Sequence, residues 1–198
     1  MNTNSPYYGL PRNQWKTKTQ QLIDAHPLTE REIVDFCLNS WDGIFTSSIG
    51  NNGLKIGKHL FPAPQIIGAL LHELIPAEIA AKYQQTWRKE QNKSDKDIVY
   101  IPNNQFSIEL KTSSNKNQIF GNRSYAQQQN SGGKSKDGYY LTVNFEKINR
   151  VNDTPSIQMI RFGWIDHTDW IGQKAETGQQ SRLSPNTYNL KLKTLYIK

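Results

Sequence analysis

Two segments in the first half of the chain carry apolar residues at the spacing of amphipathic helices. The first begins at a capping box, in which Thr29 and Glu32 can satisfy free backbone amides of the first turn. The pattern predicts one helix here, after a polar N-terminal arm (residues 1–27) that can itself form a short helix around Gln14–Ile23. The apolar positions of the predicted helix are Ile33, Val34, Phe36, Cys37, Trp41 and Ile44.

The second apolar segment follows a loop rich in Gly and Asn at residues 50–57. Pro76 is expected to end or kink this helix, because proline has no backbone N–H to donate. A second helix is then predicted from Ala77 to about Lys89. Glu73 lies at the margin of the apolar face, and His72 is expected to point further out, toward solvent or a partner. The apolar face consists of Ile66, Ile67, Leu70, Leu71 and Leu74.

From residue 97 the spacing of apolar residues along the chain changes from that of helices to that of strands. Residues 97–101 and 106–112 flank a Pro-Asn-Asn turn and predict a hairpin. Further strands are predicted within 139–145, 156–165 and 188–197, and a short helix at Ser124–Gln129. Helices followed by strands indicate an α/β (mixed α+β) fold with a central mixed sheet of about five strands flanked by helices. We expect one domain over residues 1–198, with its core at 64–145 and C-terminal strands at 146–198.

The composition of the chain narrows the range of possible functions. The 24 Lys and Arg residues exceed the 17 Asp and Glu residues, a formal net charge of +7 that favours a polyanionic partner. The single Cys37 excludes an intramolecular disulfide and a CxxC zinc site. Neither a signal-peptide run nor a membrane-spanning stretch is present, which favours a cytoplasmic protein, and the absence of a G-x-x-x-x-G-K-[ST] loop predicts no need for ATP.

The strand at 106–112 carries the candidate chemistry. Because side chains alternate along a strand, Glu109 and Lys111 must emerge on the same face, together with Ser107. Asp97 lies on that face if the hairpin loop has an odd number of residues, and Asp95 shares its parity. Turn length is not readable from the sequence, so both acids remain candidates; Asp97 is preferred because it adjoins the apolar strand.

Two carboxylates converging on one face suit a hard divalent cation, magnesium above all. Asp97 and Glu109 are therefore the predicted Mg²⁺ ligands, and Lys111 would orient or activate a water molecule and neutralise charge in the transition state. Glu73 is a candidate third acid. The alternatives are a structural Glu109–Lys111 ion pair in a non-catalytic DNA-binding module, and a DNA-repair nuclease with the same core.

Asp97, eleven intervening residues and then Glu109-Leu110-Lys111 resemble the PD-(D/E)xK nuclease signature, although Lys96 stands where the family name has proline. The phrases IIGALLHELIP, DIVYIP and FSIELKTSS are most similar to those of ScaI-type Type II restriction endonucleases. The resemblance covers about residues 28–145 and implies a restriction-endonuclease-like core. It also implies a homodimer that uses Mg²⁺ to cut both strands of double-stranded DNA, with Asp97, Glu109 and Lys111 catalytic and Glu73 as a fourth member.

Two further groups of polar residues follow the hairpin. Side chains of the types that bond phosphates and base edges come directly after it, although core packing is an equal reading for one of them, Tyr125. Asp166, His167 and Asp169 form a second group, for which a structural role is favoured over metal binding or proton transfer. Lys191 and Lys193 alternate on the last predicted strand and suggest a solvated or DNA-contacting face. The predicted DNA-contacting residues are Asn122, Arg123, Ser124, Tyr125 and Gln127.

Overall fold

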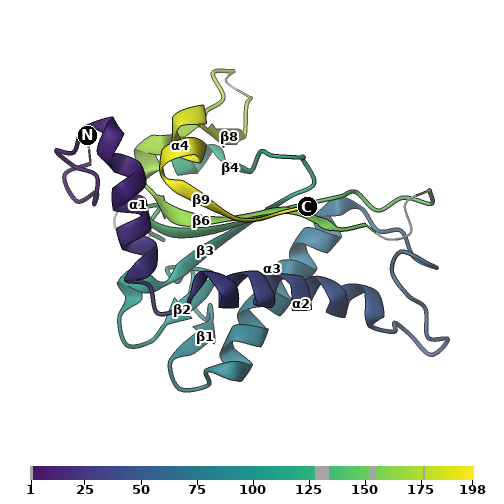
Figure 1. The fold of residues 1–198 in the computed structure, drawn as a ribbon. Coiled ribbons are helices and arrows are strands. Elements are labelled where there is room, and N and C mark those ends of the chain that lie inside the picture. The colour runs from purple at the N-terminus through teal and green to yellow at the C-terminus, as the bar shows by residue number, and fades with distance from the viewer. Residues whose placement is uncertain (1, 128–133, 152–154, 176) are drawn as a thin grey trace.

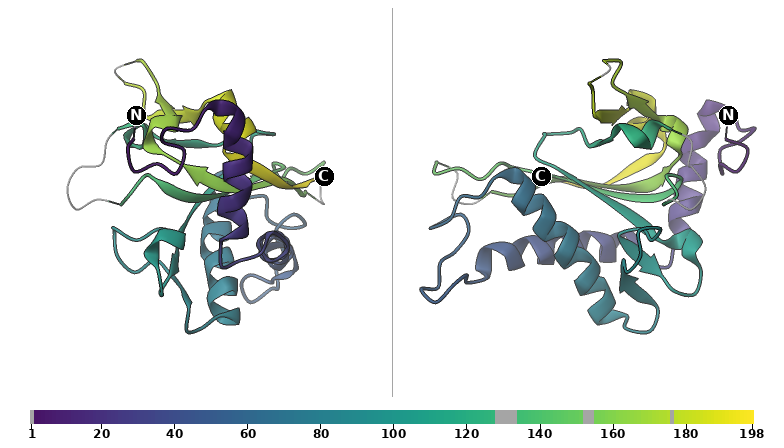
Figure 2. Two further views of the ribbon diagram at one scale, coloured as in Figure 1. Left: turned by 60° about the vertical axis from the view of Figure 1, so that its left-hand side comes forward. Right: turned by 180° about the vertical axis from the view of Figure 1, so that it is seen from behind.

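The computed structural model, which describes residues 2–127, 134–151, 155–175 and 177–198, has three layers. A six-stranded mixed sheet lies in the middle, with two long helices on one side and a three-stranded sheet on the other (Figures 1 and 2). This arrangement confirms the predicted mixed α+β fold with a central mixed sheet. None of the helices within the described residues is both long enough and apolar enough to cross a membrane.

The helices are α1 (Trp15–Asp24), α2 (Glu30–Thr46), α3 (Pro64–Lys82) and α4 (Pro185–Leu190). In spatial order, the large sheet contains β1 (Trp87–Lys89), β2 (Ile98–Tyr100), β3 (Ile108–Ser113), β5 (Gly138–Phe145), β6 (Ile157–Ile165) and β9 (Leu192–Ile197). The small sheet contains β4 (Phe120–Asn122), β8 (Gln180–Leu183) and β7 (Trp170–Gly172). Short 3-10 helices lie at Arg12–Gln14, Asn104–Phe106, Arg123–Ala126 and His167–Asp169. Strands β3 and β5 are parallel, and the other pairs are antiparallel.

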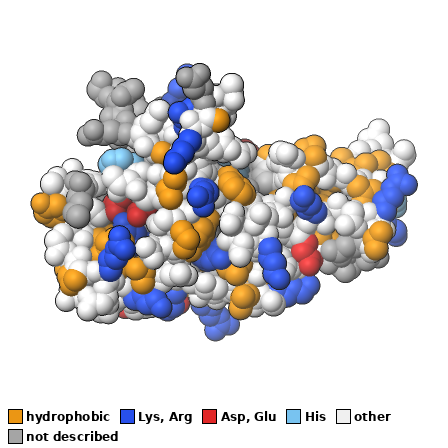
Figure 3. Space-filling model, turned by 90° about the horizontal axis from the view of Figure 1, so that it is seen from above, with side chains coloured by type: hydrophobic (Ala, Val, Ile, Leu, Met, Phe, Trp, Pro, Cys, Tyr) orange, Lys and Arg blue, Asp and Glu red, His pale blue; other side chains and the backbone are white. Residues whose placement is uncertain are grey.

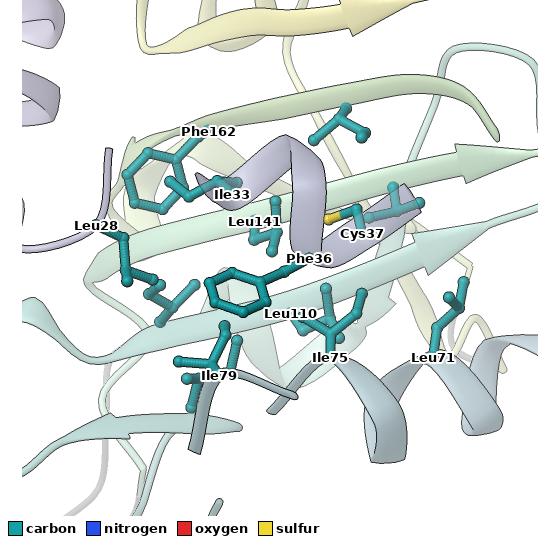
Figure 4. Packing of buried hydrophobic residues seen from close by; sticks show 14 of the residues in the cluster. Leu28, Ile33, Phe36, Cys37, Leu71, Ile75, Ile79, Leu110, Leu141 and Phe162 are labelled. Atoms are coloured by element: carbon teal, nitrogen blue, oxygen red, sulfur yellow. The ribbon is translucent and has the colours of Figure 1, made fainter. Parts of the chain in front are cut away.

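Two hydrophobic cores share the large sheet. Leu110, Leu141 and Phe162 point toward the side chains of α2 and α3, as Figure 4 shows. The opposite face packs against the small sheet through residues such as Tyr140 and Trp170. Since neighbouring side chains on a strand face opposite ways, Tyr139 belongs to the first core and Tyr140 to the second.

Most of the predicted elements are confirmed. Helix α2 begins with the predicted capping box, in which Thr29 accepts from the Glu32 amide and Glu32 accepts from the Thr29 amide. Helix α1 and the β2–β3 hairpin lie where expected, as do β5 and β6. The N-terminal arm is packed onto the protein, since Tyr7 is buried in the first core.

Pro76 does not end the helix, and the separate helix predicted from Ala77 to about Lys89 was wrong. Helix α3 runs through Pro76 to Lys82, because its buried face, which includes Ile75 and Ile79, packs on α2 and the sheet. This packing outweighs the lost hydrogen bond, since burial of an apolar face supplies most of a helix's stability. Residues 87–89, expected to be helical, form edge strand β1, in which Trp87 is buried.

Two smaller predictions also need correction. The predicted short helix at Ser124–Gln129 is a 3-10 helix at Arg123–Ala126, and residues 128–129 lie outside the described part of the chain. The predicted last strand at 188–197 begins as the end of α4, and only Leu192–Ile197 pairs with β6. A serine cap at Ser184 and Pro185 at the first helical position explain why a helix forms there.

His26 is a titratable group enclosed in the first core, and it should make stability depend on pH. Its ring lies among Trp87, Phe106, Tyr139 and Phe162. Burial lowers the pKa of His26 from 6.5 to about 4. Between these two values the unfolded chain binds more protons than the folded protein, so stability falls as the pH falls through this window. The expected loss from this group is about 3 kcal/mol of unfolding free energy.

Urea unfolding at several pH values between neutrality and pH 4 measures this loss. His26→Gln, which cannot titrate, should show a clearly shallower decline in unfolding free energy than the wild type. Identical declines in the two proteins would rule out His26 as the source.

Candidate active site

Strand β3 holds Glu109 and Lys111 on the face opposite the helices. Ile108 and Leu110 are buried in the first core, so the alternating neighbours must face the small sheet. The Glu109 side chain is only 2% exposed, and Nζ of Lys111 donates to its Oε1 at 2.7 Å. The predicted shared face is therefore present.

The register of the hairpin brings Asp97 onto the same face. Ile98 pairs with Ile108, which places Asp97 across from Glu109. Oδ2 of Asp97 accepts from the backbone N–H of Leu110 at 2.6 Å. Asp95 instead pairs with Arg88 and accepts two backbone N–H groups of the turn, so Asp97 is the acid that reaches Glu109.

A lysine from outside the hairpin joins the two acids. Nζ of Lys134 lies 2.8 Å from Oδ1 of Asp97 and 2.7 Å from Oε2 of Glu109. The two carboxylates thus converge on one cation, even though they come from different strands. This ammonium marks a position where a single positive charge contacts both predicted metal ligands.

Tyr125 closes the site from the side of the small sheet. Its hydroxyl donates to Oε1 of Glu109 at 2.5 Å, and its ring packs on Trp170 of β7. The ammonium groups of Lys111 and Lys136 lie 4.7 and 4.4 Å from its ring centroid, within the range of cation–π attraction. Tyr125 is buried, so it supports Glu109 rather than presenting a surface to DNA.

The lysines around Glu109 determine its charge. Burial raises the pKa of a carboxyl group, but Lys111, Lys134 and Lys96 outweigh it and lower the pKa of Glu109 to about 2. Lys96 is itself buried, which lowers its pKa to about 8. Its ammonium donates to the Ser135 carbonyl at 3.2 Å. Glu109 is therefore ionised at neutral pH, as a metal ligand must be.

The donor set fits a hard divalent cation held partly by the protein. Asp97 and Glu109 supply oxygen atoms, and within the described residues no cluster of three or more His, Cys, Asp or Glu side chains could bind a metal. Magnesium commonly keeps several waters and uses one or two carboxylates together with substrate phosphates. Two converging carboxylates suit that mode and do not suit a closed protein cage.

Helix α3 contributes His72 to the site instead of Glu73. Nδ1 of His72 lies 3.9 Å from Oδ2 of Asp97, and the His72 side chain is 34% exposed, so it lies beside the site while keeping the access to solvent that the sequence predicted. The Glu73 carboxylate is 65% exposed and pairs with Lys89 of β1, outside the cluster. α3 can approach β3 closely because of Gly68, where a Cβ would lie 2.8 Å from Oγ1 of Thr112.

The predicted DNA-contacting residues lie at the edge of the small sheet next to Tyr125. Asn122, Ser124 and Gln127 are exposed, as DNA contact requires. Nη1 of Arg123 donates to the carbonyls of Ala175 and Gly178, so its guanidinium also fastens the turn before β8. The side of the molecule that carries β8 and α4 shows many Lys and Arg side chains and few acidic ones (Figure 3).

Asp166 and Asp169 have the structural role that the sequence favoured. Both contact the ammonium of Lys191 at 2.7 Å, and all three side chains are largely buried. Lys191 therefore does not contribute to a solvated face, and Lys193 pairs with Glu30. His167 instead contacts Asp137, with 3.0 Å between Nδ1 and the carboxylate.

Three features of the site were not predicted from the sequence: Lys134, Lys96 and the contact of Tyr125 with Glu109. Lys96 directly precedes Asp97, and a lysine next to a predicted metal ligand is a signal that could have been used. Lys134 comes 23 positions after Lys111 in a polar run, and no local pattern connects it to the hairpin.

The sequence of this chain matches a known family. Residues 5–196 match the family described as ScaI restriction endonuclease. The Type II restriction enzyme ScaI of Streptomyces caespitosus is 46% identical over 196 residues, which cover 98% of this chain and 86% of that enzyme. No solved structure shows a significant match. Because the match spans almost the whole chain, the protein belongs to the ScaI restriction endonuclease family.

Proposed function

We propose that this protein is a magnesium-dependent Type II restriction endonuclease that hydrolyses double-stranded DNA at a specific site. It leaves 5′-phosphate and 3′-hydroxyl ends and acts as a homodimer. The observation that carries the proposal is the convergence of Asp97 and Glu109 on one cation, with Lys111 beside them. Membership of the restriction endonuclease family supports the same activity.

Each residue of the site has a distinct task in this proposal. Asp97 and Glu109 would hold Mg²⁺, which would supply Lewis-acid activation of the scissile phosphate and of the attacking water. Lys111, whose ammonium is already fixed on Glu109, orients the attacking water and offsets the negative charge that develops on the phosphate. Tyr125 fixes the Glu109 carboxylate through its hydroxyl. The Lys111 ammonium and the Glu109 carboxylate are therefore both positioned before DNA binds.

DNA binding is assigned to the edge of the small sheet. Asn122, Arg123, Ser124 and Gln127 lie there, and amide and guanidinium groups pair with base edges and phosphates. A groove of about 440 Å³ runs from His72 past the end of β3 to Phe120 and Gln180 of the small sheet. One lining residue, His72, lies 3.9 Å from Asp97, and another, Gln180, pairs with Asn122, so the groove lies between the carboxylate site and that edge and supports a DNA path along this side.

The test is incubation of the purified protein with plasmid and phage DNA, with Mg²⁺ or with EDTA. We expect discrete fragments with Mg²⁺ and intact DNA with EDTA, because the two carboxylates alone cannot activate water. Fragment ends should accept a label from polynucleotide kinase only after phosphatase treatment, as 5′-phosphate ends do. DNA that is bound but stays intact in every lane would instead support a non-catalytic binding module.

A further inference from the structure

Lys134 occupies the space between the two predicted metal ligands. Its ammonium contacts Asp97 at 2.8 Å and Glu109 at 2.7 Å, and its side chain is 16% exposed. Burial lowers the pKa of a lysine, but the two carboxylates outweigh it and raise the pKa of Lys134, so this group stays charged. A divalent cation bound by the same two oxygen atoms would collide with this ammonium or be repelled by it.

The charges around the site make this exchange necessary. Asp97 and Glu109 carry two negative charges, whereas four ammonium groups act on Glu109, those of Lys96, Lys111 and Lys134 and, more weakly, that of Lys136. A site that is already positive binds a divalent cation poorly unless one of its ammonium groups leaves. Lys111 contacts only Glu109 of the pair, and Lys96 donates to the Ser135 carbonyl. Among the described ion pairs, the one ammonium shared by both carboxylates belongs to Lys134.

We propose that Lys134 holds the metal position in the DNA-free enzyme and exchanges with the divalent cation when a DNA phosphate enters. The displaced ammonium then pairs with that phosphate, whose negative charge takes the place of the Asp97 and Glu109 carboxylates as its partner. Metal binding thereby depends on DNA binding, and the site is kept from holding an active metal ion without substrate. This inference rests on the proposed function, since it takes Asp97 and Glu109 as the metal ligands.

The experiment measures binding of Mn²⁺ to the DNA-free protein, by electron paramagnetic resonance of the free ion. Lys134→Met removes the competing ammonium, so we expect Mn²⁺ to bind at least about tenfold more tightly than to the wild type. Lys136→Met is the matched control: it removes the same charge two residues away, from an ammonium that lies over the Tyr125 ring. Its effect should stay below about threefold, because no carboxylate is released.

Three further measurements separate the possible failures. Lys134→Arg keeps the charge and should not gain affinity for Mn²⁺, and Mn²⁺ should raise the melting temperature of Lys134→Met far more than that of Lys136→Met. Equal affinities of the Lys134→Met and Lys136→Met variants would overturn the exchange while leaving the metal ligands intact. Adding Glu109→Gln to Lys134→Met should abolish the increase in affinity. If tight Mn²⁺ binding survives in that double variant, the metal lies elsewhere and the proposed function fails instead.

Discussion

Replacing Glu109 with glutamine should reduce DNA cleavage by at least roughly a thousandfold, which corresponds to about 4 kcal/mol of lost transition-state stabilisation. The amide keeps the size of the side chain and can still accept hydrogen bonds from Lys111 and Tyr125. It cannot supply the negative charge that holds the cation. With a pKa near 2, the native carboxylate is fully ionised under all ordinary assay conditions, so the substitution removes a whole charge. Initial rates on plasmid DNA at saturating Mg²⁺ measure the loss.

Glu73→Gln is the matched control for this experiment. The sequence places Glu73 in the same catalytic set, but the structure pairs it with Lys89 in a largely exposed position. Its cleavage rate should stay within about threefold of the wild type, because an exposed ion pair contributes little. A Glu73→Gln variant as inactive as Glu109→Gln would mean that α3 shifts to bring a third acid into the site. Circular dichroism and DNA-binding measurements on both variants show whether a loss of cleavage comes from the missing catalytic group or from misfolding.

Gly163→Ala should be the most destabilising small substitution in the large sheet. A Cβ at this position would lie 2.0 Å from the backbone oxygen of Lys191, and the atoms next nearest to it also belong to backbone. Backbone cannot rotate aside as a side chain can, so β9 must separate from β6 or bend. We expect a loss of about 3 kcal/mol of unfolding free energy and a fall in melting temperature of roughly 10 °C.

The control for this substitution is Gly43→Ala. Gly43 lies inside α2, and a Cβ there would meet no atom within 4 Å. Alanine should therefore stabilise the protein by about 0.5–1 kcal/mol, because glycine is a poor residue for a helix interior. Thermal unfolding followed by circular dichroism measures both changes. If the two substitutions shifted the melting temperature in the same direction, the close contact of a Cβ at Gly163 with the backbone of Lys191 would not explain the change in stability.

Local patterns predicted the parts of the fold that local interactions determine. The capping box at Thr29 and the β2–β3 hairpin depend on residues a few positions apart, and both are present. Pro76 and Trp87 were misread because their structure depends on distant partners. The packing of α3 on the sheet keeps Pro76 helical, and pairing with β2 makes Trp87 part of a strand.

The candidate site likewise has some features that local patterns predict and others that depend on distant contacts. Alternation along one strand was enough to put Glu109 and Lys111 on one face, whereas the position of Asp97 depended on a register that only the structure provides. Lys134 reaches the carboxylates from beyond the hairpin, and Tyr125 does so from the 3-10 helix before the undescribed residues 128–133. Contacts of this kind leave no periodic trace in a sequence.

The division of the protein into two cores has a practical consequence for using it as a laboratory reagent. The carboxylates, Lys111 and Tyr125 all lie on the small-sheet side of β3, whereas α2 and most of α3 pack on the other side. Directed evolution for longer shelf life can therefore concentrate on α2, at positions such as Gly43, without altering the contacts of the site. A reagent engineered in this way would keep its cutting behaviour while tolerating warmer storage.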